Sequence, residues 1–140
     1  MLNSVSIPRQ QTVLTPGKRA RWIYWIVTAP FVVTMVVAGL TYLSGASFSV
    51  NGITHLGYPV YVCKILGAGK LLGGIAILYG KFRTLKEWAY AGYTFNLLGA
   101  SASHAFSGDH FGKILVPVII LGFVLASYRL RRNSLDAKEN

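Results

Sequence analysis

Four long apolar runs constrain this chain more than any other feature. They cover about residues 22–43, 59–80, 87–106 and 112–130. Each run holds about 19–22 residues, the length that an α-helix needs to cross the hydrocarbon core of a bilayer, whereas helices of soluble proteins average ~11 residues. Backbone polar groups in hydrocarbon must bond to one another, so runs of this kind cross as helices. We therefore predict an all-α fold, an integral membrane four-helix bundle.

The composition indicates a membrane protein as well. Of the 140 residues, 53% are hydrophobic and only 13% are charged, which is too little polar surface for a soluble domain of this size. The net charge of +10 raises the alternative of nucleic-acid binding. However, the basic residues lie in short groups between apolar runs and not on one face beside stacking aromatics. We therefore expect the lipid bilayer, and no nucleic acid, as a partner.

The distribution of basic residues predicts the orientation. One set of polar segments, at both ends of the chain and at 81–86, carries eleven basic residues: Arg9, Lys18, Arg19, Arg21, Lys81, Arg83, Lys86, Arg129, Arg131, Arg132 and Lys138. The other set, 44–58 and 107–113, carries only Lys113. Because Lys and Arg are enriched in cytoplasmic loops, both termini are predicted to be cytoplasmic. We expect a multi-pass protein of the cell membrane, which for a bacterium is the cytoplasmic membrane.

The same runs predict the domain boundaries. Residues 1–21 are polar and basic and are predicted to be a disordered cytoplasmic tail. Residues 22–131 form the four-helix domain, and 132–140 form a polar C-terminal tail. The first run exceeds the ~7–15 apolar residues of a signal peptide, so we expect it to remain as a transmembrane helix, with cleavage after residues 44–46 as the alternative.

Two residues in the apolar runs are candidates for a buried polar contact. Lys70 lies about 16 Å along the second helix, near the midplane, where a charge facing lipid costs at least ~2.5–3.5 kcal/mol. Asn96 in the antiparallel third helix lies at the same depth. We expect the two side chains to meet. Since Asn96 supplies one carbonyl acceptor and no charge, either Lys70 is neutral or an anionic or polar ligand completes the site.

Small residues accompany both polar side chains. Gly67 and Gly74 lie on the same helical face as Lys70 and Cys63, and Gly92 and Gly99 share the face of Asn96. Small residues let helices approach closely in membranes. These four glycines are therefore predicted to pack the second helix against the third.

A second polar group is predicted at the outer ends of the helices. His55 precedes the second helix, His104 lies in the last turns of the third, and Asp109 follows it. We expect these three side chains to bind a ligand or to relay protons. Their spacing matches no strong metal motif, so no metal site is predicted.

Two further residues have structural interpretations. Cys63 is the only cysteine, which excludes an internal disulfide and a paired-cysteine redox site, and we expect it to be a small packing residue. Glu87 begins the third apolar run, and its carboxylate is predicted to stabilise the N-terminus of that helix.

Several segments together resemble the DoxX-like family of small four-helix membrane proteins. They are His55–Tyr61, Ile65–Gly73, Lys86–Gly92, Ser103 with His104, Gly108 with Asp109, and Ser127–Arg131. The resemblance covers about residues 22–132 and implies four transmembrane helices. The family is named for a membrane subunit of an archaeal thiosulfate:quinone oxidoreductase, and the resemblance implies no catalytic role for any residue. Its recurring residues correspond here to His55, Gly57, Pro59, Gly67, Lys70, Glu87, Trp88, Gly92, His104 and Asp109.

Three functions remain open at this point. The first is a non-catalytic membrane subunit associated with redox metabolism, which binds a small amphiphile such as a quinone or lipid or serves an oxidoreductase partner. The second is an oligomeric transporter or channel subunit, with Lys70 and Asn96 along a path between copies; four helices are few for a transporter acting alone. The third, a stand-alone enzyme, is the weakest because the sequence offers no nucleophile–base pair and no metal motif.

Overall fold

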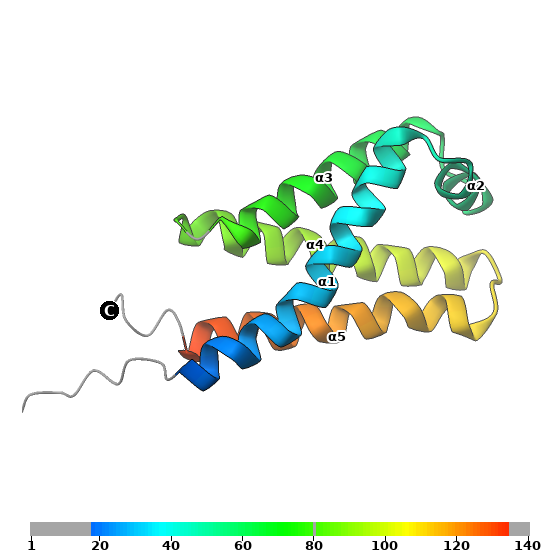
Figure 1. Cartoon of the computed structure of the whole chain (residues 1–140). Coiled ribbons are helices and arrows are strands. Elements are labelled where there is room, and N and C mark those ends of the chain that lie inside the picture. The colour runs from blue at the N-terminus through cyan, green and yellow to red at the C-terminus, as the bar shows by residue number, and fades with distance from the viewer. Residues whose placement is uncertain (1–17, 80, 135–140) are drawn as a thin grey trace, which may run out of the picture.

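The protein is described by a computed structural model that defines residues 18–79 and 81–134. These residues form five helices and no strand: α1 (Lys18–Ser44), α2 (Ser47–His55), α3 (Tyr61–Leu78), α4 (Arg83–Phe106) and α5 (Phe111–Ser134). In Figure 1 the start of α1, the α3–α4 connection and the end of α5 lie at one end of the molecule, which we call the inner end. Helix α2 and the α4–α5 connection lie at the opposite, outer end.

Three of the helices are long and apolar enough to cross a membrane. They are α1, α3 and α5, within the described residues. Helix α4 has 24 residues but a more polar sequence. Each of these four long helices packs against two others, α1 on α3 and α5, and α4 on α3 and α5. The all-α prediction is confirmed for the described residues, while a fourth crossing and the cytoplasmic position of the termini stay predictions.

The long helices extend beyond three of the predicted boundaries. Helix α1 begins at Lys18 and not at 22, α4 begins at Arg83 and not at 87, and α5 continues to Ser134 instead of ending at 130. Apolar runs mark only the part of a helix that hydrocarbon can surround, whereas Arg, Lys and Leu are good helix formers and continue the helix into the polar interface. Of the tail predicted to be disordered, residues 1–21, the last four belong to α1, and residues 1–17 lie outside the described residues.

Helix α2 was not predicted. Its 9 residues lie in the segment that we expected to be an outer loop. Ser49 and Ile53, which are four residues apart on one face, are buried, and α2 packs on α1 and α3. Such a short helix is stabilised by tertiary contacts more than by its own sequence.

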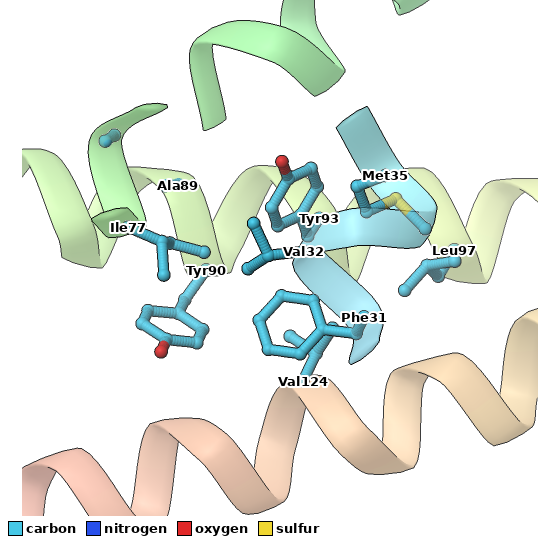
Figure 2. Close-up of a cluster of buried hydrophobic side chains, with 10 residues drawn as sticks. Phe31, Val32, Met35, Ile77, Ala89, Tyr90, Tyr93, Leu97 and Val124 are labelled. Carbon is cyan, nitrogen blue, oxygen red and sulfur yellow. The ribbon is translucent and has the colours of Figure 1, made fainter. Parts of the chain in front are cut away.

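The hydrophobic core lies where the four long helices meet. Figure 2 shows Phe31 of α1 directed toward Val124 of α5, with Tyr90 and Tyr93 of α4 beside it. The ring of Phe31 meets that of Tyr93 edge to face, with 6.2 Å between the centroids. By contrast, many large apolar side chains on the outside of the helices are exposed, such as Phe95 at 75%, as expected for surfaces that lipid covers.

Polar side chains connect the helices at the inner half of this core. The hydroxyl of Ser127 on α5 lies 2.6 Å from that of Thr28 on α1 and 2.8 Å from that of Tyr90 on α4. Nearer the inner end, Arg131 donates to Glu87 and lies over the rings of Tyr90 and Tyr128. Glu87 is therefore not at the N-terminus of its helix, as we had predicted, but pairs α4 with the buried end of α5.

The closest helix contact is the crossing of α1 and α3. At Gly67 a Cβ atom would lie only 3.0 Å from the backbone oxygen of Gly39 and from side-chain atoms of Tyr42 and Leu43. Gly67 and Gly74 thus do pack closely, but mainly against α1 and not against α4. At Gly92 and Gly99, no described atom lies within 4 Å of the Cβ position, so these two glycines do not provide the predicted close approach.

We predict that Gly67→Ala lowers the unfolding temperature of the purified protein in detergent. The added methyl group meets backbone, and overpacking of this kind costs ~1–3 kcal/mol. The matched control is Gly69→Ala on the same helix, where the Cβ position is open; it should be neutral or slightly stabilising, because Ala is a better helix former. Thermal unfolding followed by circular dichroism compares the two, and equal temperatures for both variants would contradict the tight crossing.

Candidate functional site

Asp109 gathers three nitrogen-bearing side chains at the outer end. Its Oδ2 atom lies 2.8 Å from Nδ1 of His104 and 3.0 Å from Nε2 of His55, and its Oδ1 atom lies 2.7 Å from Nζ of Lys113. The four residues come from the end of α2, the end of α4, the α4–α5 connection and the start of α5. We call them the Asp109 cluster. The three predicted outer residues are thus brought together, and Lys113 joins them.

Two glycines position the cluster. Gly108, with φ +68°, follows the end of α4 and reverses the chain, so that the N–H of Asp109 donates to the carbonyl of His104 at 3.1 Å. Gly57, with φ +84°, ends α2 in the same way, two residues after His55. A left-handed residue at this position is the usual helix C-terminal motif, and glycine adopts it without steric penalty. The two glycine turns therefore help to determine where Asp109 and His55 lie.

The carboxylate of Asp109 is held in its ionised form. Hydrogen bonds from His104, Lys113 and His55 place its pKa well below the ordinary value, outweighing a smaller opposing effect of burial. Its side chain is only 7% exposed. Within the described residues, no group of three His, Cys, Asp or Glu side chains is arranged to hold a metal ion.

A cavity of about 530 Å³ adjoins the Asp109 cluster. His55, His104 and Lys113 form its polar side. Its other walls are mostly apolar and come from α1, α2 and α5: Tyr42, Phe48, Leu56, Val116 and Pro117, with Ser49, Asn51 and Gly52. This outer cavity has the size of an ordinary small-molecule site, ~300–1,000 Å³, and the usual combination of apolar walls and a few polar groups.

A buried serine that lines the outer cavity connects α2 to α3. Ser49 is 2% exposed, and its hydroxyl has no hydrogen-bond partner among the described residues. Its backbone carbonyl accepts a hydrogen bond from Sγ of the buried Cys63, which joins α2 to α3. An unsatisfied buried hydroxyl costs free energy unless water or a ligand bonds to it.

Lys70 and Asn96 lie at a different place, in a groove of about 370 Å³ between α3 and α4. The Nζ atom of Lys70 donates to Oδ1 of Asn96, which is the contact predicted from their depths. The same Nζ lies 5.5 Å from the ring centroid of Tyr42, so the ammonium has an aromatic face as its second neighbour. Gly69 and Gly92 line this groove, where their missing side chains leave room.

The predicted ligand-binding residues lie in two separate places. His55, His104 and Asp109 belong to the outer cavity, and Lys70 and Asn96 to the α3–α4 groove. Sequence reasoning missed Lys113 and Ser49 as members of the outer site. The spacing of Lys113, four residues after Asp109, was a usable signal for Lys113, whereas Ser49 could be found only once α2 was known.

Comparison with known proteins identifies the family of this chain. A family model described as the DoxX-like family matches residues 26–127, well over half of the chain. No curated protein and no solved structure matches the chain. The matched region contains the Asp109 cluster, Lys70 and Asn96, and three of its helices can cross a membrane. This chain is therefore a membrane protein of the DoxX-like family.

Proposed function

We propose that this protein is a non-catalytic membrane component that binds a small amphiphile, a quinone or a lipid, in the outer cavity. The observation that carries the proposal is the pairing of the Asp109 cluster with apolar walls in one cavity of about 530 Å³. Such a space accommodates the polar head of an amphiphile beside His55, His104 and Lys113. Its apolar tail would lie against Val116 and Leu56.

An association with redox metabolism is part of the proposal, with the protein serving an oxidoreductase partner or acting as a homo-oligomer. A quinone is the amphiphile that would connect the cavity to such a partner. The alternative, an oligomeric transporter or channel subunit, requires a path between copies along α3 and α4, where Lys70 lies. That alternative is expected to give an oligomer without a bound amphiphile.

The proposed topology has four crossings with both ends in the cytoplasm. Helix α4, with 24 residues, is about 36 Å long, which exceeds the ~30 Å of the hydrocarbon core. It is antiparallel to α3 and α5, which can both cross. Trp88 at 73% exposure and Phe95 at 75% exposure give α4 an apolar face for lipid. These features support a fourth crossing despite the polar residues of this helix.

Cysteine labelling tests this topology. In a Cys63→Ala background, Ser107→Cys in the outer connection should react with a membrane-impermeant maleimide in intact cells. Thr84→Cys at the inner end should react only after the membrane is permeabilised. Both positions are exposed, so accessibility on the protein itself is matched. Labelling of both positions in intact cells, or of Thr84→Cys alone, would contradict the proposed orientation.

Filling the outer cavity tests the binding function. We expect Gly52→Leu to reduce the amount of co-purifying quinone or lipid severalfold, because Gly52 lines the cavity and no described atom lies within 4 Å of its Cβ position, which leaves room for the larger side chain. The control is Gly99→Leu, an open position outside this cavity, which should retain the amphiphile. Native mass spectrometry of protein extracted with its own lipids measures the bound molecule. Equal retention in wild type and Gly52→Leu would refute binding in this cavity.

For Lys70 we propose a second amphiphile contact in the α3–α4 groove, and Lys70→Met tests it. The variant should fold with little change in stability, because removal of a buried charge offsets the loss of the hydrogen bond to Asn96. It should lose a molecule bound in the groove, seen as one fewer bound amphiphile by native mass spectrometry. If stability and the number of bound molecules both stay the same, Lys70 is not a ligand contact.

A further inference from the structure

The Asp109 cluster determines which ring nitrogens of its histidines carry protons. An ionised carboxylate can only accept hydrogen bonds. Nδ1 of His104, at 2.8 Å, and Nε2 of His55, at 3.0 Å, must therefore each carry a hydrogen and donate a hydrogen bond to Asp109. A neutral imidazole has one N–H, so its other nitrogen is then an acceptor. In the neutral rings these acceptors are Nε2 of His104 and Nδ1 of His55.

Both acceptor nitrogens belong to residues that line the outer cavity, and neither has a hydrogen-bond partner within the described residues. The side chain of His104 is 23% exposed and that of His55 is 50% exposed. Because His104 is better shielded from water, its free nitrogen gains more from a ligand. His104 also lies on α4, a long helix, whereas His55 is the last residue of the short α2.

The positive charge at the cavity is compensated. Lys113 lines the cavity, but its ammonium donates to Asp109 Oδ1 at 2.7 Å. The ammonium and the carboxylate cancel, and neutral imidazoles add no charge. An anionic head group therefore meets no net opposite charge and would also face two nitrogen lone pairs. A head group that donates a hydrogen bond matches the cavity better.

The residues that line the outer cavity indicate which kind of hydrogen-bond-donating head group fits it. Tyr42 and Phe48 contribute aromatic rings to the cavity, and Pro117 adds a flat apolar surface. Aromatic rings prefer edge-to-face or offset contacts with other rings. An aromatic head with a hydroxyl group can use both the walls and the acceptor nitrogen.

We propose that the outer cavity selects amphiphiles with an aryl hydroxyl head, a phenol or hydroquinone, and that Nε2 of His104 accepts the hydrogen bond from that hydroxyl. This inference rests on the proposed function, which requires only that an amphiphile binds. It adds that the head group must donate a hydrogen bond. It also gives Asp109 a positioning role, since the carboxylate acts through the imidazole and need not touch the ligand.

A matched pair of ligands tests the proposal. Para-dodecylphenol and its methyl ether have nearly the same shape and tail, but only the phenol donates a hydrogen bond. Binding of each to the full-length protein in nanodiscs is measured by native mass spectrometry in mildly alkaline buffer, at a pH above the ~6.5 of an ordinary imidazole. We expect wild type to prefer the phenol on the order of 3- to 10-fold, the effect of one net hydrogen bond. The methyl ether should still bind.

Variants assign the preference to His104. His104→Phe should bind both ligands equally, whereas His110→Phe should keep the preference, because His110 does not line the cavity. Should His104→Phe fail to fold, NMR of isotope-labelled histidine in wild type supplies an independent measurement, and it should find the His104 proton on Nδ1. A proton on Nε2, or a preference that survives in folded His104→Phe, would overturn the assignment.

The outcomes separate the two proposals. Equal binding of phenol and ether to wild type, with Gly52→Leu reducing both, overturns hydroxyl selection but leaves amphiphile binding in place. If neither ligand binds and Gly52→Leu changes nothing, the proposed function fails and this inference fails with it.

Discussion

Polar side chains within the long helices must find partners on neighbouring helices, because lipid offers none and an unpaired polar group in hydrocarbon costs several kcal/mol. The arrangement of the helices follows from this constraint. Thr28, Tyr90 and Ser127 join α1, α4 and α5 at distances of 2.6–2.8 Å. The hydroxyl of Tyr93 on α4 donates to the backbone carbonyl of Lys70 on α3 at 2.5 Å. Each contact fixes the rotation of a helix that apolar packing alone would leave less defined.

The parts of this fold that depend on one helix at a time could be predicted from the sequence. Run length gave the four long helices, and a rise of ~1.5 Å per residue placed Lys70 and Asn96 at the same depth, where they do form a hydrogen bond. Contacts that depend on helix rotation could not be predicted in this way. A stripe of small residues indicates where another group can approach a helix closely, but it does not indicate which group does so. Gly73, outside the predicted stripe, meets the ring of Tyr93, whereas Gly92 opens a groove.

The outer site was predicted only in part because its shape arises in short segments. Because successive long helices run in opposite directions, the sequence places His55, His104 and Asp109 at the same end. The direct contact between them depends on the left-handed turns at Gly57 and Gly108, and the pattern of apolar residues does not predict these turns. Helix α2 supplies much of the cavity wall. Its 9 residues are too few to cross a membrane, so the search for long apolar runs did not predict it. Glu87 was assigned to a helix terminus because its partner, Arg131, is distant in the sequence.

The position of each side chain along the helices explains why Arg131 and Lys113 have carboxylate partners and Lys70 does not. Glu87 and Asp109 are the only acidic residues in the described part of the chain, and they pair with Arg131 and Lys113 at opposite ends of the helices. Near the membrane surface, water lowers the cost of bringing two charges together. At the depth of Lys70, a carboxylate would add a second large desolvation penalty, which the attraction between the charges need not repay. Lys70 has instead an amide oxygen and an aromatic face, which stabilise an ammonium without bringing another charge into hydrocarbon.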